Sequence, residues 1–74
     1  MNFEKALAIA KKLKPNVDAC DEYDKAFLFK CKAEEWMIGG DGPVVVLKDT
    51  GKAINQVVFF DQYGPELIRS FDIT

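Results

Sequence analysis

Two unbroken apolar runs, separated by a glycine-containing turn, constrain this chain most strongly. The runs are 44–47 (VVVL) and 57–60 (VVFF), with the sequence DTG between them. Gly51 supplies the positive φ angle that a tight turn requires. We therefore predict an antiparallel hairpin that pairs 43–48 with 53–60. Because neither run alternates with polar residues, either both faces of this hairpin are covered or one face is left for a partner.

The N-terminal segment has the spacing of an amphipathic helix. Asn2 is a suitable N-cap, lysines crowd the last turn, and Pro15 follows. These signals predict a helix over 2–14. Its apolar residues recur at helical spacing and are Phe3, Ala6, Leu7, Ala10 and Leu13.

The remaining segments predict one strand, one connection and one short helix. Aromatic and small apolar residues alternate with other residues over 25–32, which predicts a half-buried strand. The polar, acidic segment 16–24 is predicted to connect the first helix to this strand. From Gly64 onward, Pro65 stands where a first helical residue would lie and apolar residues follow at helical spacing, so we predict a short C-terminal helix.

Together these elements predict one α+β domain over residues 1–74. The expected order is α-β-β-β-α, with an N-terminal helix, a three-stranded antiparallel sheet and a short C-terminal helix. A chain of 74 residues is near the lower limit for independent folding, but 49% of it is apolar. We therefore expect enough buried surface to offset the entropy of ordering the chain.

Charge and hydropathy restrict the class of partner. The net charge is −2 and the sequence pI is about 5.0, so the chain lacks the positive field that nucleic-acid binding normally uses. No apolar run reaches the ~20 residues that span a bilayer, and no signal-peptide pattern is present. We expect no nucleic-acid or membrane partner and a cytoplasmic location. Cys20 and Cys31 are too few for a disulfide framework, so we expect free thiols.

The residue chemistry argues against an enzyme and against a bound metal or cofactor. The chain has no His, and Ser70 is its single serine, without the glycine elbow of a nucleophile. Two cysteines without His do not complete a structural zinc site. The carboxylates of 18–24 miss the calcium-loop pattern. The glycine cluster 39–42 leads into a predicted strand, whereas phosphate cradles lead into a helix.

Acidic residues are the best candidates for binding a protein partner. They gather in two segments predicted to be loops, where they can meet a basic partner without exact geometry. Trp36 is either part of the core or an exposed anchor of the kind that dominates interface energetics. The candidate partner-binding residues are Asp21, Glu22, Asp24, Glu34, Glu35, Trp36 and Asp41.

Short motifs along most of the chain resemble the YrhB-like bacterial family, also described as immunity protein 35. They comprise an N-terminal helix pattern, an aromatic strand, a glycine-rich entry to an apolar strand, a D-x-x-T-G-like turn and a terminal proline motif. The resemblance implies a protein that binds and neutralises a co-encoded toxin without catalysis of its own. The matching residues are Glu4, Ala6, Leu7, Phe27, Phe29, Gly40, Gly42, Pro43, Asp49, Thr50, Gly51 and 65–68.

Three functional hypotheses follow from the sequence. The first is an immunity-type protein that covers a toxin with its acidic and glycine-rich segments. The second is a structural module that forms a homodimer through the apolar run 57–60. The third is a small-ligand or catalytic pocket near Trp36, Phe59 and Phe60. The predicted element order also resembles PepSY-type inhibitory modules, so fold similarity alone does not select a partner.

Overall fold

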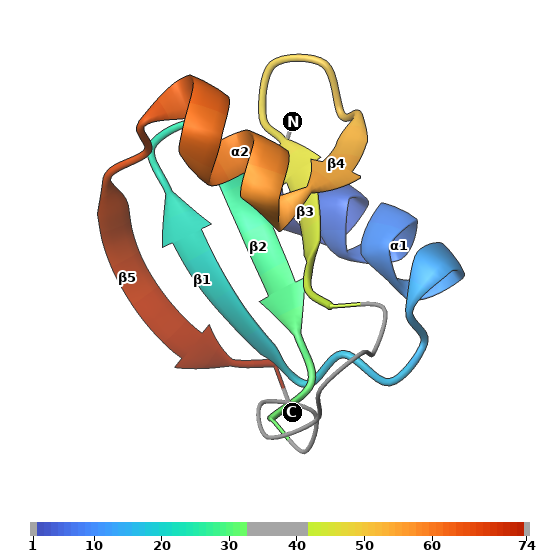
Figure 1. Ribbon diagram of the computed structural model, residues 1–74. Helices are drawn as coiled ribbons and strands as arrows, with labels where there is room; N and C mark the ends of the chain where they lie inside the picture. The colour runs from blue at the N-terminus through green and yellow to red at the C-terminus, as the bar shows by residue number, and fades with distance from the viewer. Residues whose placement is uncertain (1, 33–41, 74) are drawn as a thin grey trace.

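The computed structural model describes residues 2–32 and 42–73 and shows an α+β domain built on one antiparallel sheet. The sheet has five described strands in the spatial order β4-β3-β2-β1-β5 (Figure 1). The general class agrees with the sequence prediction, whereas the predicted number of three strands is wrong. The elements are α1 (Phe3–Leu13), β1 (Ala19–Tyr23), β2 (Ala26–Lys30), β3 (Val44–Leu47), β4 (Ala53–Asn55), α2 (Gln56–Tyr63) and β5 (Leu67–Asp72).

Helix α1 forms as the sequence predicts. The Asn2 side chain accepts a hydrogen bond from the Lys5 backbone N–H at 2.9 Å, which satisfies one of the unpaired donors of the first turn. At the other end, the Lys14 N–H donates to the Ala10 carbonyl at 2.7 Å. Within the described part of the chain, no helix is long and apolar enough to cross a membrane.

One face of the sheet packs against α1. Phe3, in the first turn of the helix, is the centre of an aromatic cluster in which its ring lies 5.6 Å from Phe27, 5.8 Å from Phe29 and 5.3 Å from Phe71. Ala6 and Ala10 are fully buried, and their small side chains allow the helix to lie close to the strands. This face therefore joins strands β2 and β5 to a single helix.

The other face of the sheet packs against α2. Phe59 is fully buried, and its ring lies 5.4 Å from the ring of Tyr23 in an edge-to-face arrangement. Figure 1 shows α2 crossing this face on the side opposite α1. Both faces of β2 and β3 are thus covered, which decides between the two alternatives left by the unbroken apolar run. The buried residues around Phe59 are Tyr23, Ala26, Leu28, Val45 and Leu47.

The turn between β3 and β4 is confirmed. Gly51 has a φ angle of 72°, and its N–H donates to the Leu47 carbonyl at 2.9 Å. The Leu47 N–H in turn donates to the Lys52 carbonyl at 2.9 Å. The left-handed conformation at Gly51 closes the hairpin, as the sequence predicts.

The predicted strand over 53–60 is only partly correct. Its first three residues form β4, and the chain then enters α2. The Asn55 side chain starts this helix by accepting the Val57 N–H at 2.7 Å, and Gly64 ends it at a φ angle of 52°. The two caps and the burial of Phe59 outweigh the strand preference of the β-branched and aromatic run.

Two further predictions are wrong. The segment 16–24 is not merely a connection, because it contains β1, which lies between β2 and β5. The C-terminal segment is not a helix, because it forms β5 and pairs antiparallel with β1. Backbone hydrogen bonds from Asp24 N–H to the Glu66 carbonyl and from Ile73 N–H to the Asp18 carbonyl hold the two ends of this pair. Tertiary strand pairing therefore overrides the local helix signals of the tail.

We predict that α2 depends on the Phe59 side chain. Phe59→Ala should lower the free energy of unfolding by about 3–5 kcal/mol, because it opens a cavity in a fully buried site. Phe60→Ala is the matched control, because Phe60 is 46% exposed and its loss should be smaller, about 1–2 kcal/mol. Urea denaturation of both variants measures the difference. Equal losses would contradict the packing described for α2.

Candidate functional site

The first two predicted binding residues, Asp21 and Glu22, do not form one acidic surface. They are consecutive in β1, so their side chains point to opposite faces of the sheet. Asp21 is paired across the strands with Leu28, on the face that α2 covers, and Glu22 with Phe27, on the face that α1 covers. The acidic sequence pattern is therefore divided between two environments.

Asp21 lies in a shallow polar hollow between β2, β1 and β5. Its carboxylate is 3.3 Å from the Lys30 ammonium, and its side chain is 15% exposed. The second carboxylate oxygen is buried and has no hydrogen-bond partner among the described residues. The hollow has a volume of about 270 Å³ and is lined by Ala19, Asp21, Lys30, Lys32, Ser70, Phe71 and Asp72.

Glu22 is held between two cations on the opposite face. Its carboxylate oxygens accept hydrogen bonds from Lys48 Nζ and Arg69 Nε, both at 2.8 Å. The Lys48 ammonium lies 4.9 Å from the centre of the Phe27 ring, and the Arg69 guanidinium lies 5.0 Å from that of Phe71. The hydrogen bond from Lys48, followed by that from Arg69, lowers the pKa of Glu22 below its ordinary value. This cluster links strands β1 and β5 to the end of β3.

Asp24 fastens the start of β5 to the turn between β1 and β2. Its carboxylate accepts the Glu66 N–H at 3.1 Å, and its own N–H donates to the Glu66 carbonyl at 3.0 Å. Asp24 is therefore placed by a structural contact, although it is exposed. The other predicted site residues, Glu34, Glu35, Trp36 and Asp41, lie outside the described residues.

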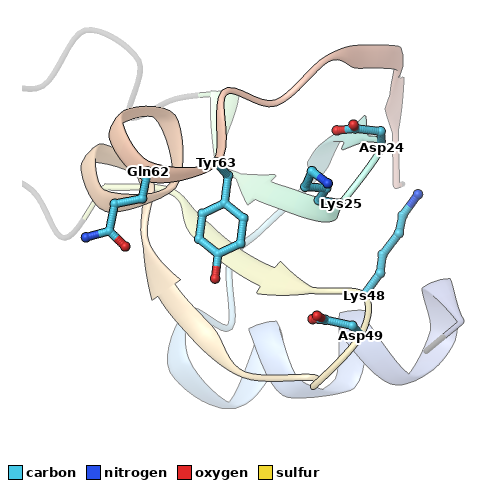
Figure 2. A pocket seen from close by; sticks show the side chains of 6 residues that line it. All are labelled: Asp24, Lys25, Lys48, Asp49, Gln62 and Tyr63. Carbon is cyan, nitrogen blue, oxygen red and sulfur yellow. The ribbon is translucent and has the colours of Figure 1, made fainter.

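A pocket opens between the two turns and the end of α2. Figure 2 shows Gln62 and Tyr63 on one side and the charged side chains on the other. Its volume is about 500 Å³. Lys48 and Asp24 already have partners within the protein, so the pocket offers balanced and partly engaged charges. Its lining residues are Asp24, Lys25, Lys48, Asp49, Gln62 and Tyr63.

The sequence suggested that the apolar run 57–60 could face a partner, but it did not indicate an exposed apolar surface shared by α2 and the start of β5. Val57 is 68% exposed, Phe60 46% and Leu67 52%. Val57 and Phe60 are neighbours on the helix at a spacing of three residues. The Phe60 ring lies 5.5 Å from the ring of Tyr23, whose register partner on β5 is Leu67. We call these three residues, Val57, Phe60 and Leu67, the α2–β5 surface.

The sequence signal for this surface was the apolar composition of the run 57–60. Four consecutive apolar residues on a helix point to more than one side, so part of their apolar area stays exposed when only one side packs on a sheet. Recognising it required the cap at Asn55 and the glycine at position 64, which define the segment as helical. The strand prediction for the same run obscured the surface.

Both cysteines are free and buried. Cys20 is paired with Phe29, so Cys31 occupies a diagonal rather than a directly opposite position on the same face. Burial, with further contributions from the neighbouring charges of Asp21 and Glu22, raises the pKa of Cys20 to about 12. A thiol in this state is protonated at neutral pH and is a poor nucleophile.

Comparisons with family models, with curated proteins and with solved structures gave no match to this chain. Among residues 2–32 and 42–73, no group of three or more potential ligand side chains is arranged to hold a metal ion. A functional proposal therefore depends on the surface geometry of the described residues.

We predict that Glu22 makes stability depend on acid pH. Because its folded-state pKa is lowered, its stabilisation is complete above the ordinary value of 4.5 and is lost as the pH falls through the folded-state pKa. At pH 7, Glu22→Gln should lower the free energy of unfolding by about 1 kcal/mol, and the difference from wild type should vanish near pH 2. Urea denaturation at a series of pH values measures this convergence, with Glu66→Gln as an exposed control. A constant difference across the series would contradict the prediction.

We also predict slow chemical modification of Cys20. In a Cys31→Ser background at pH 8, a disulfide reagent such as dithionitrobenzoate should react with Cys20 at least about 100-fold more slowly than with an exposed cysteine peptide. Burial and the raised pKa both reduce the thiolate available for attack. Addition of guanidinium chloride should restore the ordinary rate. A rapid reaction under native conditions would show that the strand opens locally.

Proposed function

We propose that this protein is a non-catalytic binding domain of the immunity type, which neutralises a partner toxin by docking it on the α2–β5 surface. The observation that carries the proposal is the exposure of Val57, Phe60 and Leu67 on adjoining elements. Contiguous exposed apolar side chains are typical of surfaces that bind other proteins. The resemblance to the YrhB-like family supports the same class of function.

The anchor of this surface is already ordered. The Phe60 ring packs against Tyr23 at 5.5 Å and against Phe59 at 5.5 Å. An aromatic side chain held in this way loses little conformational entropy when a partner covers it. Phe60 is therefore the residue on this surface best suited to act as a binding hot spot.

The charged residues of α2 and of the segment that joins it to β5 are acidic, and this favours a basic partner, while Lys25 and Lys48 lie beside the C-terminal end of α2. Asp61 and Glu66 are both exposed, and the sequence contains no Lys or Arg between Lys52 and Arg69. The C-terminal end of α2, at Tyr63, adds the partial negative charge of the helix dipole. The complementary partner has an apolar centre with Lys or Arg at its rim.

The described carboxylates of β1 also support a binding role rather than catalysis. Asp21 is paired with Lys30, and Glu22 is hydrogen-bonded to two cations. General acid or base catalysis needs a carboxyl group with a pKa near the working pH. The pKa of Glu22 moves in the opposite direction, because its cations favour the charged form.

Protection of cells tests this proposal. Co-expression with a candidate toxin encoded beside the gene should restore growth, and calorimetry with the purified toxin domain should show a direct complex. Phe60→Lys should weaken binding by about 30-fold or more, as expected for a hot-spot residue. Leu13→Lys is the matched control. Leu13 is 60% exposed and belongs to α1, which packs on the face of the sheet opposite α2, so this variant should bind like wild type.

The outcomes separate the function from the surface. Failure of protection together with failure to bind would contradict the immunity function. Protection that Phe60→Lys and Leu13→Lys leave equally intact would place the toxin on another surface. Loss of binding in Phe60→Lys counts only if circular dichroism and thermal unfolding show that the variant is folded.

A further inference from the structure

Strand β5 forms one edge of the sheet and has six residues, more than any other described strand. Among the described residues it pairs with β1 alone, and no described element lies beyond it in the sheet (Figure 1). Five of its residues are exposed, and the strand contains neither Lys nor Pro, which commonly protect sheet edges. The opposite edge strand, β4, has three residues and continues directly into α2.

The direction of the unpaired backbone groups on β5 follows from one hydrogen bond. Ile73 N–H donates to the Asp18 carbonyl at 2.8 Å, so Ile73 faces β1. Hydrogen-bonded and non-hydrogen-bonded pairs alternate along an antiparallel ladder. Phe71 and Arg69 therefore also bond β1, whereas the N–H and C=O groups of Ser70 and Asp72 point away from the sheet.

A bulge limits the regular part of this edge. The register with β1 shifts between Glu22, which pairs with Arg69, and Tyr23, which pairs with Leu67, so Ile68 is the extra residue. The regular register therefore runs over 69–72, and the hydrogen bond from Ile73 to Asp18 extends the pairing by one residue to 73. The central residue of 69–73 is Phe71, with the two outward-facing residues placed symmetrically on either side.

We propose that a second copy of this chain pairs antiparallel with β5 about a two-fold axis at Phe71, joining two five-stranded sheets into one. In this register Ser70 of each copy lies opposite Asp72 of the other, and their outward N–H and C=O groups bond reciprocally. The serine hydroxyl is a donor and the aspartate carboxylate an acceptor, so their side chains are also complementary. Phe71 of each copy meets its equivalent in a non-hydrogen-bonded pair, where side chains are closest.

Charge is compatible with self-pairing about an axis at Phe71 and opposes an axis at Arg69. The exposed Arg69 is hydrogen-bonded to Glu22, and the exposed Asp72 is paired with Lys32 at 2.6 Å, so the edge carries no uncompensated charge. A two-fold axis at Arg69 would place two guanidinium groups directly opposite each other, which is unfavourable. The axis at Phe71 avoids this contact and uses the full paired stretch, 69–73.

This inference is independent of the proposed toxin binding, because it uses the outer backbone edge of β5 rather than the α2–β5 surface. A self-paired strand of this length gives a small isologous interface, which corresponds to weak and reversible association. The expected behaviour is a monomer at low concentration and a dimer at high concentration.

Sedimentation equilibrium from about 1 µM to about 1 mM tests the proposal, and this range spans weak association. The wild type should change from monomer to dimer. Ser70→Pro should remain monomeric throughout, because proline removes an outward N–H without removing a bond to β1. Ser70→Ala keeps this N–H and should dimerise, and Phe60→Lys should also dimerise because its surface is not used.

Hydrogen exchange provides a second measurement that does not depend on a variant. The Ser70 and Asp72 amides should exchange at least about tenfold more slowly at 1 mM than at 10 µM, whereas the inward-facing amide of Phe71 should change little. A wild-type monomer over the whole concentration range would overturn the proposal. So would a dimer that Ser70→Pro leaves intact or that does not protect the Ser70 and Asp72 amides.

Discussion

The two-sided burial of β2 and β3 is the constraint on which the rest of this structure depends. Phe27 and Phe29 face α1, whereas Ala26 and Leu28 on the same strand face α2. A strand that is apolar on both faces is stable only when both faces are covered. In a chain of 74 residues this requires a helix on each side of one small sheet. The position of α2, and with it the end of β4, follows from this requirement.

Strand β1 shows how the same sheet accepts charge near its centre. Asp21 and Glu22 are largely buried at 15% and 16% side-chain exposure, but each contacts a cation from a neighbouring strand or turn. Contacts of this kind offset much of the desolvation that would otherwise disfavour a buried carboxylate. The acidic residues that resembled a solvated loop therefore help to hold β5 against the sheet through Arg69.

The parts of the fold that could be predicted are those specified by local signals. Helix α1 has both its caps and its apolar spacing in the sequence, and Gly51 specifies the turn before β4. The run 57–60 could not be assigned from composition, because its residues favour a strand while the caps at Asn55 and Gly64 favour a helix. The α2–β5 surface could not be predicted either, because it exists only if that run is helical. The sequence identified Asp21 and Glu22 as candidate binding residues because they are acidic. It could not show that they lie on opposite faces of the sheet, because it did not predict β1 as a strand.

The uneven placement of the helices explains why the exposed features gather at β5. Helix α1 packs over β2 and β3, and helix α2 packs mainly over β3 and β4, so β5 is held mainly by β1 and by the Phe3 contact with Phe71. Five of its six residues consequently remain exposed, although the strand is firmly paired on its inner side. Substitutions that alter only its outward groups leave the two buried clusters intact. This region of the domain can therefore evolve new contacts with partners at little cost in folding stability.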